Sequence, residues 1–152
     1  MNIAVVGLGF VGLSISSVLA SKNYNIVGID IDNQKCSDIR NGVLPLFEPD
    51  LGNTLKIGLK KKLTVSNNFS LIKNCDMIFV TVGTPQKSNG AIELSMIKKA
   101  TTTIGQIIRK SKKNPIIFIK STVIPGTAEN VIVPILELSL IHISEPTRPR
   151  LI

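Results

Sequence analysis

The sequence GLGFVG at residues 7–12 decides the fold, and it reads Gly7-Leu8-Gly9-Phe10-Val11-Gly12. An apolar run, Ile3 to Val6, ends where this stretch begins, and a helical apolar pattern follows it. In such a turn, the first glycine makes the tight bend, the second lets backbone approach a pyrophosphate, and the third lets the helix pack closely. Unpaired N–H groups and the positive end of the helix dipole then bind the pyrophosphate. We therefore predict a dinucleotide site formed by these six residues.

An acidic residue follows the second apolar run, as a dinucleotide site requires. That run covers residues 25–29, and Asp30 follows it directly, roughly twenty residues after the glycine turn. Asp30 is predicted to accept hydrogen bonds from the adenosine ribose, and its charge would repel a 2′-phosphate. NAD is therefore favoured over NADP. The helix between the two runs has apolar residues on one face, namely Val11, Ile15, Val18 and Leu19.

The composition predicts a globular domain with a core. The chain has 152 residues, of which 43% are hydrophobic and 18% charged. The first 21 residues carry no charge, but they lack the basic start of a signal peptide, so a cytoplasmic location without a membrane segment is expected. Cys36 and Cys75 lack metal-binding or disulfide spacing and are expected to be small buried hydrophobes, with no metal site.

A net charge of +8 gathers in the lysines at 60–62 and in the basic residues at 98–113. Nucleic-acid binding is not predicted, because aromatic residues do not alternate with these cations: the chain has one tyrosine and no tryptophan. The basic residues are interpreted as solvated helix faces.

Apolar runs alternate with helical patterns along the chain, which is typical of a parallel sheet covered on both faces. The predicted strands are residues 3–6, 26–29, 63–65, 77–82 and 116–119. A crossover helix is predicted from Leu94 to Lys110, with its inward face formed by Ile97, Ala100, Thr101, Ile104, Ile107 and Ile108. The fold class is therefore α/β, a doubly wound parallel sheet (Rossmann fold) with strand order 3-2-1-4-5.

Polar residues stand at the carboxyl ends of these strands, where ligands of open α/β sheets bind. Thr84 follows the fourth strand, and Ser121 and Thr122 follow the fifth. Thr127 is a candidate N-cap for the next helix. Local turn bonding is the alternative for each hydroxyl, but strand ends that meet at one crevice favour a binding role.

Five motifs, in this order and spacing, resemble the nucleotide-sugar dehydrogenases, the family of UDP-glucose 6-dehydrogenase and its UDP-N-acetylmannosamine and GDP-mannose relatives. They are GLGFVGL at 7–13, GIDID at 28–32 with Lys35 after it, the stretch from Asn41-Gly42 to Pro45 with Glu48-Pro49, GTP at 83–85, and KSTVIPGT at 120–127. The resemblance covers residues 1–137 and is strongest to UDP-glucose 6-dehydrogenase.

The resemblance implies roles for particular residues. Asp30 and Lys35 would contact the adenosine side of NAD, and Thr84, Ser121 and Thr122 would line the nicotinamide side. Thr122 would also help to hold a catalytic water. The reaction implied for the intact parent, a homodimer acting on a nucleotide sugar, is oxidation of the C6 alcohol to a carboxylate with two NAD, through an aldehyde and a cysteine adduct.

Two departures from the family pattern stand out. Glu93 replaces a usual aspartate at an expected helix start, a change that should leave cofactor binding intact. The nucleophilic cysteine, its partners and the uridine-binding domain would all lie beyond this sequence, so the chain is expected to be inactive alone and truncated after about the fifth strand. Loss of a sixth strand would leave an unpaired sheet edge and favour aggregation. Cys36 and Cys75 match no catalytic motif.

The tail at residues 138–152 departs from the family pattern. Its stretch LSLIHISEPTRP resembles a translated sequencing adapter. Residues 1–137 are therefore predicted to form the NAD-binding domain. His142, which lies in the tail, is predicted to be neither a ligand nor a catalytic base. A genuine C-terminal segment is the alternative.

Two other functions are compatible with the glycine fingerprint. One is a regulatory NAD-binding module of a transport system, and the other is the cofactor domain of a hydroxyacyl or phosphogluconate dehydrogenase. The motifs Glu48-Pro49, Thr84-Pro85 and Lys120-Ser121-Thr122 favour the nucleotide-sugar dehydrogenase, because a regulatory module has no need of them.

Overall fold

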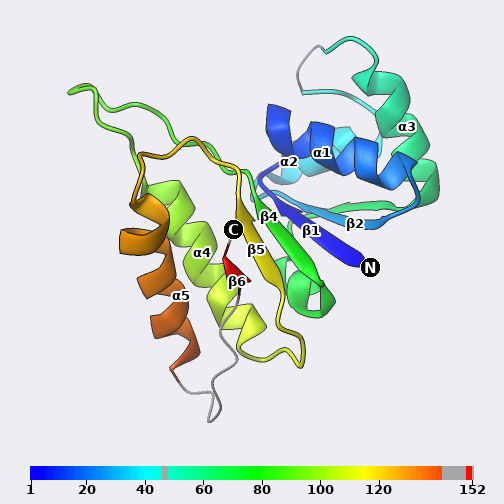
Figure 1. Cartoon of the computed structure of the whole chain (residues 1–152). Coiled ribbons are helices and arrows are strands. Elements are labelled where there is room, and N and C mark those ends of the chain that lie inside the picture. The colour runs from blue at the N-terminus through cyan, green and yellow to red at the C-terminus, as the bar shows by residue number, and fades with distance from the viewer. Residues whose placement is uncertain (46–47, 142–149, 152) are drawn as a thin grey trace.

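The computed structural model describes residues 1–45, 48–141 and 150–151, and it shows a parallel sheet between two layers of helices (Figure 1). Within these residues, six strands lie in the order β3-β2-β1-β4-β5-β6, and every pairing is parallel. The predicted order of the first five strands is confirmed. The strands are β1 (Asn2–Val6), β2 (Asn25–Ile29), β3 (Leu63–Ser66), β4 (Met77–Val80), β5 (Ile116–Ile119) and β6 (Arg150–Leu151).

Both faces of the sheet are buried, as a doubly wound fold requires. Ile3 and Val5 of β1 join the core on the side of α1 and α3, whereas Ala4 and Val6 join the core on the side of α4 and α5 (Figure 1). No helix in the described part of the chain is both long and apolar enough to cross a membrane. The helices are α1 (Phe10–Ser21), α2 (Asn33–Arg40), α3 (Leu51–Lys61), η1 (Phe69–Asn74), α4 (Ser95–Ile108), η2 (Ala128–Ile132) and α5 (Val133–Leu140).

Strand β5 has a partner on its outer edge, contrary to the expectation of an unpaired edge. Ile116 pairs with Arg150 and Ile117 with Leu151. An edge strand carries free N–H and C=O groups that any extended segment can pair with, which accounts for this short sixth strand. Helix α5 continues to Leu140, so the predicted boundary after residue 137 falls inside a helix. His142 lies outside the described residues.

The apolar face predicted for helix α1 is only partly the buried one, because Ile15 and Leu19 pack against the core but two of the predicted residues do not. Val11 and Val18 are exposed, whereas Ser17 and Ala20 are buried. The reason is close packing against α3: a Cβ placed on Gly58 would lie 3.2 Å from both the Ala20 Cβ and the Ser17 carbonyl oxygen. Only small side chains fit at this contact, so Val11 and Val18 face outward, while Leu13 is buried and Ile15 and Leu19 pack against the core beside it.

The buried hydroxyl of Ser17 has no hydrogen-bond partner among the residues that the structure describes. A buried polar group without a partner costs about 1–3 kcal/mol, so Ser17→Ala is expected to raise the free energy of unfolding by about 1 kcal/mol, measured by urea denaturation. Ser16→Ala is the matched control, because the equally buried Ser16 hydroxyl donates to the Gly12 carbonyl at 2.7 Å. A Ser17→Ala chain no more stable than the Ser16→Ala chain would contradict the prediction.

Candidate functional site

The glycine turn lies between β1 and α1, and its three glycines have different surroundings. Gly7 has φ +99°, and a Cβ there would lie 2.8 Å from the Val82 amide nitrogen. A Cβ on Gly12 would lie 1.9 Å from the Gly7 carbonyl oxygen, whereas a Cβ on Gly9 would meet nothing within 4 Å. Gly7 and Gly12 are therefore required by the protein's own packing. Gly9 leaves open space beside the backbone.

The first turn of α1 is free to bind a ligand. Gly9 is its N-cap residue, and no described side chain caps the helix there. The helix begins with Phe10 and Val11, which are both exposed, and its amide N–H groups carry the positive end of the helix dipole. Leu8 is fully buried, and its side chain packs where a Cβ on Gly28 would lie. Leu8 can therefore contribute to a ligand site only through its backbone.

Asp30 stands at the end of β2, and its carboxylate is only 7% exposed. One oxygen, Oδ2, accepts from the Leu8 amide at 2.8 Å and from the Lys35 ammonium at 3.0 Å. The other oxygen, Oδ1, accepts from the Asp32 amide at 3.1 Å. Asp30 therefore joins the glycine turn to the start of α2.

Lys35 belongs to the first turn of α2, whose N-cap is Asp32. The Asp32 side chain accepts from the Lys35 amide at 3.0 Å, which holds this turn in place. The Lys35 ammonium then reaches back to Asp30 as a half-buried ion pair. The two residues predicted for the adenosine side are thus in direct contact.

Hydroxyl groups tie together the loops that follow β4 and β5. The Thr84 hydroxyl donates to the Thr122 carbonyl at 2.7 Å, and the Ser121 hydroxyl donates to the Val82 carbonyl at 2.7 Å. These bonds cross between loops, unlike the local turn bonds considered as the alternative. The Thr122 side chain is exposed, and its hydroxyl makes no hydrogen bond with a described residue. By strand order, these loops lie on the opposite side of β1 from Asp30.

Two predicted helix starts have different outcomes. Glu93 accepts from the Ser95 amide at 2.8 Å where α4 begins, and this hydrogen bond, together with Lys87 at 3.1 Å, holds the pKa of the Glu93 carboxyl below its usual value. Thr127 precedes η2, but its hydroxyl caps nothing. Its backbone is already helical (φ −62°, ψ −36°), whereas a capping residue needs an extended backbone.

One residue at the glycine turn was missed by the sequence analysis. Thr81 follows β4, and its hydroxyl lies 2.7 Å from the Gly7 carbonyl oxygen and 3.1 Å from that of Val6. The available signal was a single polar residue inside the apolar run of residues 77–82. The predicted strand includes Thr81, whereas β4 ends at Val80.

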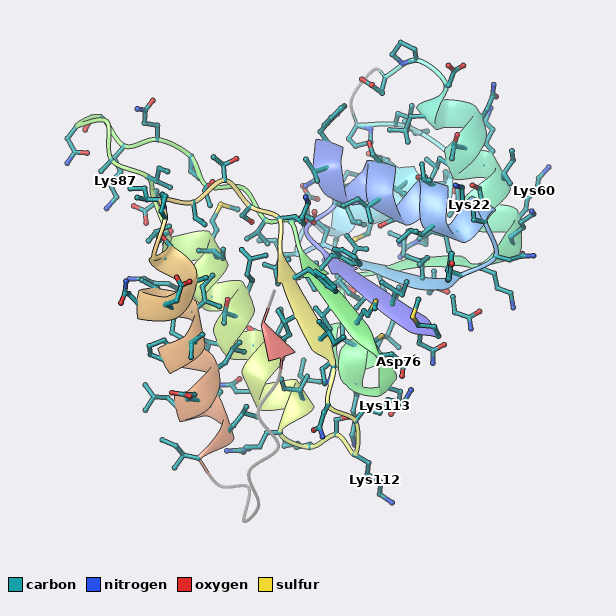
Figure 2. All side chains as sticks on the ribbon, in the orientation of Figure 1. Lys22, Lys60, Asp76, Lys87, Lys112 and Lys113 are labelled. Atoms are coloured by element: carbon teal, nitrogen blue, oxygen red, sulfur yellow. The ribbon has the colours of Figure 1, made fainter. Side chains whose placement is uncertain are left out.

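Basic residues lie in two separate places at the amino ends of the strands, away from the glycine turn. Lys22 and Lys60 lie where α1 and α3 end, and Lys112 and Lys113 lie in the segment before β5 (Figure 2). Lys113 and the Asn2 amide contact Asp76 and lower the pKa of its carboxyl. This contact stabilises the fold above the usual aspartate pKa of about 3.9, and its contribution is lost progressively as the pH falls from that value through the lowered pKa of the folded chain.

Both thiols are buried, as predicted. Burial raises the pKa of Cys36 above its usual value and that of Cys75 to about 11. Within residues 1–45, 48–141 and 150–151, no group of three His, Cys, Asp or Glu residues is placed to hold a metal ion.

Neither Cys36 nor Cys75 is expected to react with iodoacetamide in the folded chain at about pH 8, because the thiolate is the reactive form and both groups stay protonated and covered. Mass spectrometry should show two modified thiols only after denaturation. Rapid modification of either thiol in the native chain would contradict this expectation.

Sequence comparison places the site in a known family. The profile of the UDP-glucose/GDP-mannose dehydrogenase family, NAD binding domain, matches residues 1–144. A GDP-mannose 6-dehydrogenase from Pseudomonas syringae pv. tomato is 39% identical over 139 residues, which cover 90% of this chain and 32% of that protein. A Bacillus subtilis protein named putative UDP-glucose 6-dehydrogenase YtcA is 37% identical, covering 86% of this chain and 30% of that protein. The chain thus spans about a third of the length of these relatives.

Solved structures agree with the sequence comparison. The GDP-mannose dehydrogenase from Pseudomonas aeruginosa, a ternary complex, superposes with a TM-score of 0.88 at 33% identity, covering 91% of this chain and 32% of that one. A UDP-glucose dehydrogenase from Pyrobaculum islandicum gives a TM-score of 0.88 at 25% identity, covering 99% and 34%. The chain therefore belongs to the UDP-glucose/GDP-mannose dehydrogenase family and constitutes an NAD binding domain of that family.

Proposed function

We propose that this chain binds NAD across the carboxyl edge of its sheet, as the cofactor-binding part of an enzyme that oxidises the C6 alcohol of a nucleotide sugar to a carboxylate. The proposal depends on one observation, that three features suited to a dinucleotide meet at the same turn. They are the open space at Gly9, the start of α1 without a side-chain cap, and the Asp30 carboxylate. Membership of a dehydrogenase family favours this function over a regulatory module or a hydroxyacyl or phosphogluconate dehydrogenase.

The glycine turn and β2 would hold the adenosine diphosphate part of the cofactor. The first amides of α1 offer N–H donors and a positive dipole to the pyrophosphate. Three donors already contact the Asp30 carboxylate, which has about four lone-pair positions, so one position remains for a ribose hydroxyl. The negative charge of Asp30 disfavours a 2′-phosphate. Lys35 holds the carboxylate group in position through its contact at 3.0 Å.

The loops after β4 and β5 would face the nicotinamide. NAD, when bound, accepts a hydride from the substrate alcohol. Thr84 and Ser121 use their hydrogens to join the two loops, which fixes the shape of this side of the site. The exposed Thr122 hydroxyl makes no hydrogen bond within the described part of the chain and is proposed to orient a water molecule.

The nucleotide sugar is proposed from two different observations. The motifs resemble UDP-glucose 6-dehydrogenase most strongly, which favours UDP-glucose. GDP-mannose is the second candidate, because relatives with 39% and 38% identity carry the name GDP-mannose 6-dehydrogenase.

The proposal is tested by adding NAD with UDP-glucose or GDP-mannose and following NADH. The 152-residue chain is expected to bind NAD and to produce no NADH with either sugar. The full-length product of the gene is expected to form NADH with one of the two sugars. NADH production by the 152-residue chain, or none by the full-length product with any nucleotide sugar, would refute the proposal.

A further inference from the structure

The peptide unit that joins Gly7 to Leu8 is held at both ends by side chains from different strands. Its carbonyl oxygen lies 2.7 Å from the Thr81 hydroxyl, and its N–H donates to Asp30 Oδ2 at 2.8 Å. Thr81 follows β4 and Asp30 follows β2, and these two strands flank β1 in the sheet. A single peptide unit of the glycine turn thus forms hydrogen bonds with side chains that follow both neighbouring strands.

Helix α1 covers the hydrogen bond between Thr81 and Gly7. A Cβ on Gly12 would lie 1.9 Å from the Gly7 carbonyl oxygen and 2.6 Å from the Thr81 hydroxyl, so the backbone of α1 passes directly over both atoms. Thr81 itself is only 9% exposed. A buried carbonyl that loses its donor has little access to water and is left unsatisfied.

The Thr81 hydroxyl also bears on the orientation of the peptide that follows Gly7. Gly7 has no Cβ and adopts φ +99°, so no side chain of its own restricts the orientation of the peptide that follows it. If this peptide flipped, its oxygen in place of its N–H would face Asp30, and the carboxylate would be repelled. In the observed orientation the Thr81 hydroxyl can donate to the Gly7 carbonyl while Leu8 donates to Asp30, so both ends of the peptide are satisfied together.

We propose that Thr81 is a positioning residue for the cofactor, acting through the Gly7–Leu8 peptide on both the turn and the Asp30 carboxylate. The inference rests on the proposed NAD site. The alternative is a threonine that stabilises a strand end and has no influence on the ligand. The positioning role predicts a loss of NAD affinity when only the Thr81 hydroxyl is removed, and the purely structural role predicts no loss.

Three variants test this proposal in the 152-residue chain. Thr81→Val removes the hydroxyl at nearly constant shape, and Thr81→Ser restores it. Thr101→Val is the matched control, because Thr101 is also buried and its hydroxyl donates to the Ile97 carbonyl at 2.7 Å, within α4. The readouts are NAD affinity by titration calorimetry and exchange of the Leu8 amide hydrogen by NMR.

Thr81→Val is expected to weaken NAD binding about tenfold and to speed exchange of the Leu8 amide about tenfold. Thr81→Ser is expected to stay within about twofold of the wild type in both readouts, and Thr101→Val should leave both unchanged. Wild-type affinity and exchange in Thr81→Val would overturn the proposal, as would equal losses in the Ser and Val variants.

If Thr81→Val does not fold, Thr81→Cys replaces it: a thiol is a weak donor, so intermediate affinity is expected and wild-type affinity would overturn the proposal. If the wild-type chain itself does not bind NAD, the proposed function fails. Exchange of the Leu8 amide then decides alone whether Thr81 fixes the peptide.

Discussion

Replacing Gly12 with alanine is expected to lower the free energy of unfolding by about 3 kcal/mol or to prevent folding. The added Cβ would lie 1.9 Å from the Gly7 carbonyl oxygen and 2.6 Å from the Thr81 hydroxyl. The first of these atoms belongs to the backbone of the turn, so α1 must move away from it. Urea denaturation followed by circular dichroism measures the loss.

Gly9→Ala is the matched control for Gly12→Ala. A Cβ on Gly9 meets nothing within 4 Å, and its backbone (φ −75°, ψ −163°) suits any residue. This variant should unfold like the wild type, yet its NAD affinity should fall by about tenfold or more, because the methyl group occupies space meant for the pyrophosphate. Equal stability of the two variants would contradict the packing interpretation. Unchanged NAD affinity in Gly9→Ala would contradict the proposed site.

Asp30→Asn is expected to weaken NAD binding at least about tenfold and to remove most of the discrimination against NADP. The amide group places a donor where the carboxylate accepts from Leu8, Asp32 and Lys35, so one of these donors loses its partner. The loss should also lower the free energy of unfolding by about 2 kcal/mol. The ratio of NAD to NADP affinity, measured by titration calorimetry, is the decisive quantity.

Lys35 explains why the ratio should change. Its ammonium lies 3.0 Å from Asp30 Oδ2, and the neutral variant frees this charge to contact a 2′-phosphate. Adding Lys35→Met to Asp30→Asn should therefore abolish the gain in NADP affinity while NAD affinity stays low. If the double variant binds NADP as well as Asp30→Asn does, Lys35 has no part in the discrimination.

The sheet was predictable because its signals are local. The predicted strand at residues 116–119 matches β5, and the crossover helix lies within its predicted bounds as Ser95–Ile108. An apolar run between turn residues requires burial on both sides, whatever the rest of the chain does. The glycine turn is local as well, since Gly7 to Gly12 are consecutive.

The features that the sequence did not predict are contacts between residues far apart in the chain. The buried face of α1 depends on Gly58 of α3, and no pattern within α1 reveals that a small residue will face it there. The partner of Thr84 is a carbonyl 38 residues away, and the partner of Thr81 is 74 residues away. Strand β6 pairs with the outer edge of β5, and the pattern of apolar and polar residues within either segment does not predict this pairing.

A crystal structure of the 152-residue chain with NAD tests the central claim most directly. We expect the pyrophosphate within hydrogen-bond distance of the amides at the start of α1, beside Gly9, and the adenosine ribose at the Asp30 carboxylate. The nicotinamide should lie toward Thr84 and Thr122. A cofactor bound at any other edge of the sheet, or a ribose that does not contact Asp30, would contradict the account.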